Sequence, residues 1–298
     1  MSDAAKPQPD PSQILNKALS RALQGGISGM AAMAIQVSSL MWLRTTMNYQ
    51  YRYGTTTTQA LKTLYAEGGI PRFYRGILPA LIQGPLSRFG DTAANAGVLA
   101  LMDSMDSTRN LPVGLKTLAA STGAATWRIF LMPVDTLKTT LQVEGAKGMS
   151  VLKGKLKTGG IPVLYHGALA ASAATLVGHF PWFFTYNYLD EVLPKPETGL
   201  QKLGRSALMG FSASVISDTC SNSVRVIKTT KQTSATVISY PEAVKMVIQA
   251  DGIAGLFGRG LKTRILTNGL QGLLFSVLWR YIDEAVFGHK KSSRSSSE

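Results

Sequence analysis

Cysteine, histidine and acidic residues are scarce in this chain. Its 298 residues include one cysteine, Cys220, so no disulfide framework can form. Three scattered histidines beside that cysteine do not make the ligand clusters that hold zinc in proteins. Charged residues make up 16% of the chain, against about a quarter in typical soluble domains. This composition leaves open two classes, a soluble protein and a membrane protein with a polar interior.

Signatures of catalysis are also missing. We find no set of nucleophile, base and orienting group, and the phosphate-binding pattern Gly-x-x-x-x-Gly-Lys does not occur. We therefore expect no enzymatic activity, no cofactor and no metal. Lysine and arginine outnumber the acids by 31 to 17. These bases alternate with long apolar runs that nucleic-acid-binding modules do not need, so we expect no nucleic acid partner.

Long apolar runs favour the membrane class. Ala22–Leu43 contains no charged residue and Ala168–Leu189 is interrupted only by His179, and each run has 22 residues. About 20 apolar residues are enough to cross a bilayer as a helix. Arg88 and Arg128 lie inside other apolar segments, where an ionisable side chain should face a water-filled cavity rather than lipid. The pattern predicts an all-α membrane protein.

One pattern of ten residues occurs three times, with a basic residue at its sixth position. The three bases, Arg44, Lys138 and Lys228, are 94 and 90 positions apart. The second copy alone begins with proline and has an acid, Asp135, two positions later. A proline inside a helix removes a hydrogen bond and bends the helix, which turns the acid and the base toward neighbouring elements. The three copies are Ser39–Asn48, Pro133–Gln142 and Ser223–Gln232.

A second pattern, which ends in glycine, follows each copy of the first. Its final glycines, Gly76, Gly167 and Gly260, are 91 and 93 positions apart. Two independent patterns with one period indicate a threefold tandem repeat. The copies of this second pattern are Gly69–Gly76, Gly160–Gly167 and Asp251–Gly260.

Each repeat is predicted to contain two long helices with a short amphipathic helix between them. Six long helices put both chain ends on one side of the membrane, so the short helices lie on the other side. That side carries many bases and few acids, so by the positive-inside bias it should face the interior compartment, or at least anionic lipid. The repeats are placed at residues 14–108, 109–196 and 197–289, between a disordered lead (1–13) and a disordered tail (290–298). The long helices are predicted at 14–48, 76–104, 112–142, 167–193, 201–232 and 261–287, and the short ones at 55–66, 149–157 and 241–250, with a polar connection at 49–54.

The two patterns resemble those of the mitochondrial carrier family, in which a Pro-x-Asp/Glu-x-x-Lys/Arg motif ends each odd-numbered helix. The resemblance covers roughly residues 15–287. It implies six transmembrane helices in three pseudo-symmetric repeats, closed around a central solute site in the mitochondrial inner membrane. It further implies a monomeric, multi-pass protein that works by alternating access between a matrix gate and a cytoplasmic-side gate.

The matrix gate that the resemblance implies is incomplete. Of its three acidic positions only Asp135 is acidic, because Met41 and Arg225 stand at the other two. One carboxylate among four cations predicts at most two ion pairs, and the remaining bases repel one another unless an anion or water enters. Ser39 and Ser223 replace the motif proline, which predicts straighter helices there. The implied gate residues are Arg44, Asp135, Lys138, Gln142, Arg225, Lys228 and Gln232.

Three further residue sets follow from the resemblance. The main solute positions are uncharged, which argues against a dicarboxylate, a tricarboxylate or a nucleotide held by several charge-assisted bonds. The solute-binding set is Gln83, Arg88, Arg128, Thr175, His179, Thr267 and Asn268. The cytoplasmic-side gate set is Asn187, Asp190, Arg280 and Asp283. Cardiolipin is expected at helix N-termini, which bind anions, near Arg75, Gly76, Gly167, Arg259 and Gly260.

A carrier for a small anionic or zwitterionic metabolite is the leading interpretation, because unpaired bases in a cavity attract anions. The alternative is a degenerate protein of the same fold that no longer transports and acts as a membrane scaffold or complex subunit, as the incomplete gates suggest. A soluble helical-repeat interaction protein is a third possibility, which membrane retention after carbonate washing would exclude.

Overall fold

The computed structural model describes residues 33–274, apart from the side chains at positions 88, 92–96, 99–100, 103–104, 106, 113 and 200. Every regular element in this range is helical, and no strand occurs in it. The longer helices are 33–53, α3 (Ile77–Ser104), α5 (Val113–Phe130), α6 (Met132–Glu144), α8 (Ala168–Val192), α9 (Gly199–Thr233) and 261–274. The remaining ones are α2 (Thr57–Phe73), α4 (Asp106–Arg109), α7 (Gly148–Gly159), α10 (Tyr240–Gly258) and the 3-10 turns η1 (Gly145–Lys147) and η2 (Ile161–Tyr165).

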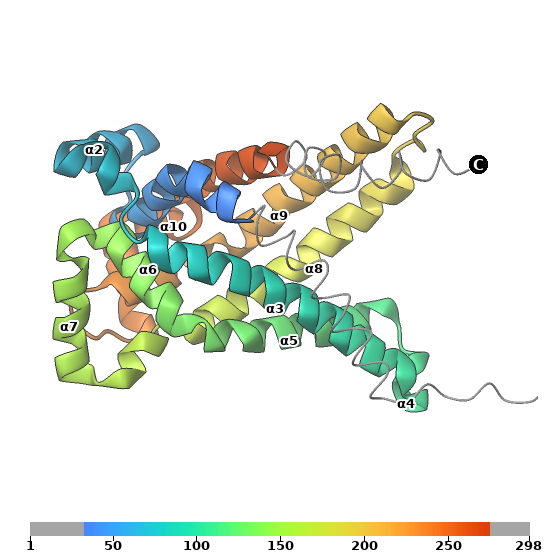
Figure 1. Cartoon of the computed structure of the whole chain (residues 1–298), viewed down its shortest axis with the longest axis horizontal. Coiled ribbons are helices and arrows are strands. Elements are labelled where there is room, and N and C mark those ends of the chain that lie inside the picture. Colours follow the sequence, from blue (N-terminus) through green and yellow to red (C-terminus); the bar gives the residue numbers. More distant parts are fainter. Residues whose placement is uncertain (1–32, 275–298) are drawn as a thin grey trace, which may run out of the picture.

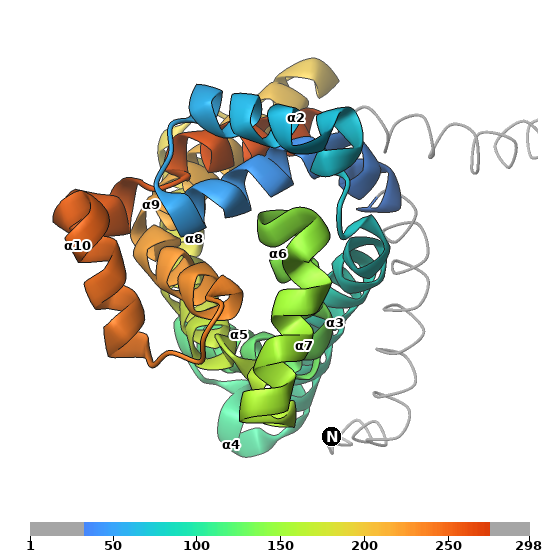
Figure 2. The same ribbon diagram turned by 90° about the vertical axis from the view of Figure 1, so that its left-hand side faces the viewer.

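The longer helices surround a common axis, as the end-on view shows (Figure 2). Along the chain, α3 packs against α5, α5 against α8, and α8 against α9. The three elements α2, α7 and α10 lie at one end of the molecule, around the outside of the ring (Figures 1 and 2). We call this the short-helix end.

Local sequence signals explain where several helices begin. Thr56 precedes α2 and Thr198 precedes α9, and each hydroxyl accepts a hydrogen bond from the backbone N–H three residues later. In both cases that later residue is a glutamine whose side chain accepts a hydrogen bond from the backbone of the threonine, which completes a capping box. Ser239 and Glu242 form the same arrangement at the start of α10.

Pro133 coincides with a break in the predicted helix 112–142. α5 ends at Phe130 and α6 begins at Met132, because the proline ring offers no N–H and crowds the preceding turn. Helix 33–53 and α9 instead run without interruption through Ser39 and Ser223. The two serines thus leave their helices continuous.

Some predicted boundaries are wrong. Residues 49–53, predicted as a polar connection, continue helix 33–53 to its end. α2 and α10 run past the predicted ends at 66 and 250, because helical residues resume after Gly69 (φ 64°) and Gly252 (φ 68°). The predicted helical parts at 14–32 and 275–287 lie outside the described residues.

Three basic side chains tie the short-helix end together. Each donates to backbone carbonyls in the last turn of a longer helix that comes from another third of the chain. Such carbonyls lack partners within their own helix, and the helix dipole makes that end negative. The contacts are Arg72 with Gln142 (2.8 Å) and Val143 (2.7 Å), Lys155 with Gln232 (3.0 Å), and Arg259 with Arg52 (3.1 Å).

The interior is more polar than an ordinary protein core. Within residues 33–274, some of the buried apolar residues form two small clusters, and many other buried side chains are threonines, including the Thr-Thr pairs that follow each motif base. The clusters are Val37, Met41 and Ala80, and Tyr51, Val226 and Val247.

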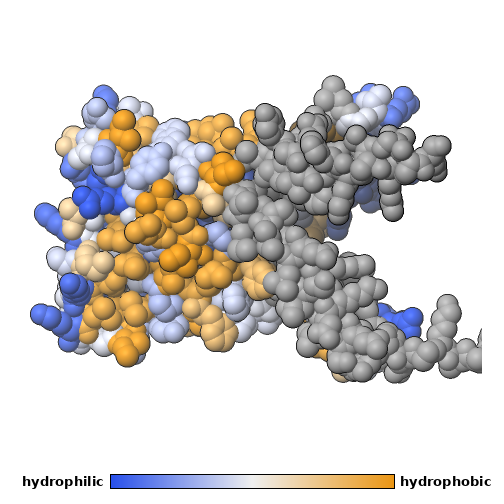
Figure 3. Space-filling model, in the orientation of Figure 1, coloured by the Kyte–Doolittle hydropathy of each residue, from blue (hydrophilic) through white to orange (hydrophobic). Residues whose placement is uncertain are grey.

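The outer surface is apolar over its middle. Figure 3 shows hydrophobic residues across the centre of the face in view and hydrophilic residues toward the short-helix end. Large exposed side chains include Phe130, Phe180 and Phe184. Within residues 33–274, one helical segment, Ile161–Val192, is long and apolar enough by composition to cross a membrane.

Candidate functional site

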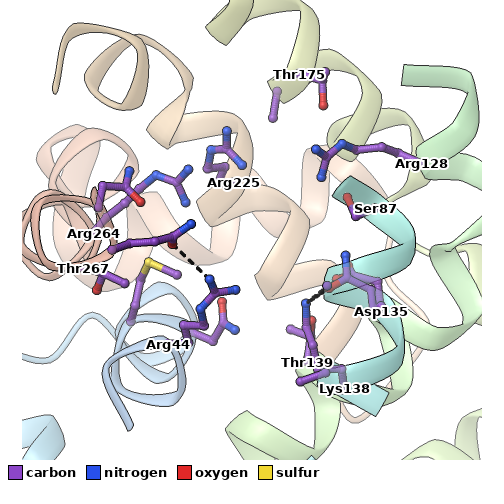
Figure 4. Close-up of a pocket in the computed structure, with 18 of the residues that line it drawn as sticks. Arg44, Ser87, Arg128, Asp135, Lys138, Thr139, Thr175, Arg225, Arg264 and Thr267 are labelled. Atoms are coloured by element: carbon purple, nitrogen blue, oxygen red, sulfur yellow. Dashed lines mark hydrogen bonds and ion pairs between the residues drawn. The ribbon is translucent and has the colours of Figure 1, made fainter. Parts of the chain in front are cut away.

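A cavity of about 730 Å³ lies between the longer helices. Basic side chains reach into it from several sides (Figure 4). Most residues of the predicted solute site and matrix gate line this cavity, namely Arg44, Gln83, Arg128, Asp135, Lys138, Gln142, Thr175, His179, Arg225, Lys228, Thr267 and Asn268.

Asp135 on α6 binds two lysines. Its Oδ1 accepts a hydrogen bond from Lys138 (2.7 Å) and its Oδ2 accepts one from Lys228 on α9 (2.6 Å). Gln232 donates to the same carboxylate over 3.3 Å. The Asp135 side chain is only 9% exposed, and burial of a carboxylate requires this kind of pairing. A single acid thereby joins α6 to α9.

Gln142 joins α6 to helix 33–53 without any charge. Its Oε1 accepts a hydrogen bond from Asn48 (2.6 Å), and its Nε2 donates to the sulfur of Met41 (3.4 Å). Met41, which stands at an acidic motif position, is fully buried beside Val37 and Ala80. The contact between these two helices is therefore polar and apolar rather than ionic.

Arg44 and Arg225 reach the cavity from helix 33–53 and α9. Arg44 Nη2 donates to Gln271 Oε1 (3.0 Å), and Arg225 Nε donates to Ser221 Oγ (3.2 Å). Within residues 33–274 neither arginine forms an ion pair with a carboxylate. Two like charges thus face the cavity where the complete motif would supply an acid and a base.

Arg128 and His179 are each hydrogen-bonded at the cavity wall. Arg128 Nη2 lies 2.8 Å from Asp91 Oδ2, so one base of the cavity is neutralised by a partner from α3. His179 Nδ1 lies 2.6 Å from the hydroxyl oxygen of Ser121 on α5. These pairs connect α3 with α5 and α5 with α8.

One ion pair beside the cavity was not predicted from the sequence. Arg264 Nε lies 2.6 Å from Asp218 Oδ1, and the amide of Asn268 donates to the other oxygen of that carboxylate. Asp218 is the only charged residue between Arg205 and Arg225. A lone acid in an apolar helix predicts a buried partner, so this signal could have revealed the site.

The uncharged solute positions already hold hydrogen bonds. Gln83 Oε1 accepts from Lys138 Nζ (3.0 Å). The hydroxyls of Thr175 and Thr267 donate to carbonyls four residues earlier in their own helices (3.1 and 2.6 Å). A hydroxyl that donates keeps acceptor capacity, and the amide nitrogen of Gln83 keeps its donors, so these groups can still contact a solute.

The predicted cytoplasmic-side gate is described in part. Asp190, near the end of α8, pairs with Arg205 on α9, and Asn187 is exposed. Arg280 and Asp283, the other predicted members, lie outside the described residues, as does the side chain of Arg88.

The predicted lipid-binding residues differ in their surroundings. Arg75 is exposed, whereas Arg259 is buried with its Nε 2.7 Å from Asp251 and its Nη1 on the Arg52 carbonyl. Arg259 therefore links protein segments in this structure. Gly76 begins α3 with a left-handed backbone (φ 82°) that favours glycine.

His166 stands where Arg75 stands in the first copy of the glycine pattern. An imidazole has a usual pKa of about 6.5, so it carries much less positive charge at pH 7 than the guanidinium of Arg75. Cardiolipin binding at these helix starts stays a prediction, and it is better founded beside Gly76 than beside Gly167.

The cavity has an excess of positive charge. Asp91 and Asp135 line it, and Asp218 adds a third carboxylate as the partner of Arg264. An excess of cations in a cavity attracts anions. No group of three or more potential metal ligands occurs among the described side chains. The basic residues that line the cavity are Arg44, Arg128, Lys138, Arg225, Lys228 and Arg264.

Comparison with known sequences matches residues 15–101 and 109–197 to the family model described as Mitochondrial carrier protein. S-adenosylmethionine carrier 1, chloroplastic/mitochondrial, of Arabidopsis thaliana is 30% identical over 178 residues, which cover 59% of this chain and 50% of that protein. The mitochondrial carnitine carrier of Saccharomyces cerevisiae is 26% identical over 213 residues, 67% and 64% of the two chains. Mitochondrial thiamine pyrophosphate carrier 1 of Candida albicans is 24% identical over 178 residues, 55% and 58%. This chain spans about half to two thirds of the length of these relatives.

Proposed function

This chain belongs to the mitochondrial carrier family, because the family model matches more than half of it, and we propose that it carries a small anionic or zwitterionic metabolite by alternating access. The relatives named for S-adenosylmethionine, carnitine and thiamine pyrophosphate support solute transport rather than catalysis. Each of those three solutes combines an oxyanion with a positively charged centre. We place the protein in the mitochondrial inner membrane, although one relative is named for chloroplasts as well.

The proposal includes six transmembrane helices in three repeats, at residues 14–108, 109–196 and 197–289. The ties made by Arg72, Lys155 and Arg259 support it, because each runs from one of these segments to the next in cyclic order. The apolar outer surface and the polar interior are also what a bilayer requires of a carrier.

The observation that carries the proposal is the cationic cavity of about 730 Å³. Ligand pockets for small molecules measure about 300–1,000 Å³, so a metabolite fits. Its bases supply charge-assisted hydrogen bonds to an oxyanion. The carboxylates of Asp91 and Asp135 are already paired with bases, so a cationic centre of the same solute would contact them only by displacing a basic side chain.

Asp135 gives the cavity a means of coupling solute binding to opening. Lys138 contacts both Asp135 and Gln83, so a solute oxyanion at Gln83 competes with Asp135 for the same ammonium group. Because Lys138 and Asp135 both belong to α6, this competition changes the charge around Asp135, whose separate contact with Lys228 links α6 to α9. In the empty protein this carboxylate would again contact both lysines.

Uptake into liposomes tests the proposal. Purified protein would be reconstituted and offered a panel of radiolabelled carboxylates, amino acids, zwitterions and phosphate esters. We expect uptake of at least one solute, strongly reduced in Lys138→Gln and unchanged in Lys62→Gln, which removes one charge from an exposed site on α2. If no solute is taken up and the protein co-purifies in a larger complex, the scaffold alternative is the better account.

Localisation needs its own experiment. We expect full-length protein to sediment with inner-membrane markers and to resist extraction by carbonate. Recovery in plastids or in the soluble fraction would contradict the proposed location without bearing on the solute.

A further inference from the structure

The third copy of the ten-residue pattern carries Arg225 where the motif has an acid. Asp135 in the second copy contacts Lys228, the base of the third copy, so an acidic position meets the base of the next copy. By the same relation, position 225 is equivalent to the acid that would pair with Arg44, the base of the first copy. Two arginines, on α9 and on helix 33–53, therefore stand where the complete motif has an acid and a base, and both line the cavity (Figure 4).

The two guanidinium groups have many free donors. An arginine offers five N–H groups, and the structure records one hydrogen bond for each of these arginines among the described residues. The Nε of Arg44 is buried without a partner within that range. Figure 4 shows Arg44, Arg225 and Arg264 around one side of the cavity. Arg264 is close enough to act electrostatically on both of the others, although its own charge is paired with Asp218.

A further polar group with an unused donor lies in the same place. The hydroxyl of Tyr51 lines the cavity and is buried beside Arg264, and no acceptor for its proton is recorded among the described residues. It lies within electrostatic reach of Arg225 and Arg264. A phenolic O–H can donate to an anion beside the guanidinium groups.

Oxyanions are the ligands that such a group of donors selects. Guanidinium groups bind carboxylate and phosphate through paired, nearly parallel hydrogen bonds, and an anion between two like charges removes their repulsion. We propose that Arg44 and Arg225 together bind one oxyanion, a carboxylate or phosphate group, which joins helix 33–53 to α9 as the carboxylate of Asp135 joins α6 to α9. The oxyanion thus replaces the acid that position 225 lacks.

The consequence for the proposed carrier is closure that depends on an anion. The α6–α9 contact has its own carboxylate, whereas the contact between α9 and helix 33–53 gains one only when the oxyanion binds. The anion can come from the solute itself or from free phosphate. This consequence rests on the proposed function, but the anion site itself does not.

Thermal unfolding of the purified protein in detergent tests the site directly. Inorganic phosphate and acetate, added at constant ionic strength, are expected to raise the unfolding temperature of the wild type. Arg44→Gln and Arg225→Gln should each weaken phosphate binding by about tenfold or more, the effect of losing a charge-assisted hydrogen bond. Arg225→Glu should unfold at a higher temperature than wild type without phosphate, because Glu at position 225 pairs with Arg44, and it should no longer respond to phosphate.

Lys62→Glu is the matched control, since it reverses one charge on the exposed surface of α2. It should keep the full response to phosphate. The proposal is overturned if neither anion stabilises the wild type, or if Arg225→Glu and Arg225→Gln respond to phosphate as the wild type does.

Liposome uptake separates the two sources of the anion. If free phosphate fills the site, wild-type uptake depends on phosphate; if the solute fills it, uptake does not depend on phosphate and is lost in Arg225→Gln. A wild type that responds to phosphate but transports no solute contradicts the proposed function and leaves the anion site standing. Transport that is unchanged in both Arg44→Gln and Arg225→Gln contradicts the anion site alone.

Discussion

Asp135 on α6 and Lys228 on α9 are 93 positions apart in the sequence and lie in direct contact, with 2.6 Å between Oδ2 and Nζ. The other oxygen of the same carboxylate binds Lys138. Because both lysines pair with one acid, loss of this carboxylate leaves two cations without an ion-pair partner among the described residues.

Asp135→Asn should destabilise the protein strongly. The substitution leaves Lys138 and Lys228 without a carboxylate in a largely buried place, which costs about 3–5 kcal/mol. Thermal unfolding in detergent measures the effect. Asp190→Asn is the control, because the Asp190 side chain is 57% exposed and its pair with Arg205 should contribute less than about 1 kcal/mol. Equal losses in the two variants would contradict the special role of Asp135.

Arg264→Gln should be harmful alone and largely rescued by Asp218→Asn. The single change leaves a buried carboxylate with Asn268 as its remaining described partner, at an expected cost of about 3 kcal/mol. The double variant removes both charges and restores a neutral contact. A double-mutant cycle on unfolding temperatures checks this coupling. Additive losses would show that the two residues do not act as a pair.

Gly260→Ala should destabilise the junction between α10 and helix 261–274. The residue has φ +66°, and a Cβ there would lie 2.7 Å from the ring of Tyr51. A left-handed alanine alone costs about 1–3 kcal/mol, and the contact adds to it. Gly258→Ala is the matched control two positions earlier, since nothing lies within 4 Å of its Cβ position. That variant should change stability by less than about 1 kcal/mol.

Lys155 should make stability depend on pH above neutrality. Burial, with the charges of Lys231 and Arg52, lowers the pKa of Lys155 to about 8 from its usual 10.5. The folded state thus disfavours the protonated amine. Above pH 10.5 the amine is neutral in both the folded and the unfolded chain, and the folded state pays no penalty. As the pH falls from 10.5 to about 8, the unfolded chain takes up the proton first, so the free energy of unfolding decreases.

The measurement compares wild type with Lys155→Met between pH 8 and 10.5. The difference in unfolding temperature should shift in favour of the wild type as the pH rises. Lys153→Met, at an exposed position of the same helix, should show a constant difference. A constant difference for Lys155→Met as well would contradict the effect of burial on its pKa.

Much of the fold could be predicted because its signals are local and repeated. The capping threonine before α9 and the motif glycines before α3 and α8 mark helix starts within one or two residues. Pro133 likewise marks the break between α5 and α6. Residues 49–53 were misassigned because polar side chains there suggested a loop, whereas contacts with neighbouring segments, such as Tyr53 Oη with Glu144 (2.8 Å), accompany a continued helix.

The sequence indicated several residues that line the cavity, but it did not indicate which of their side chains contact one another. The motif frame indicated Arg44, Lys138 and Lys228, and all three line the cavity. It did not indicate Arg264 with Asp218, because neither residue belongs to a repeated pattern. Motif spacing states which positions are equivalent, and it carries no information about which side chains meet.

The sequence by itself determined most of the described helical elements, the threefold period of the two sequence patterns and the missing acids at positions 41 and 225, since apolar runs, prolines and glycines act over a few residues. Only the tertiary structure decided that Asp135 pairs with two lysines and that Arg44 and Arg225 line one cavity. It also decided that Lys155 donates to a carbonyl at the end of α9, as Arg72 and Arg259 do at the ends of two other helices. The physical reason is that ion pairs and caps depend on distances of a few ångströms between helices far apart in the chain, and packing alone sets those distances.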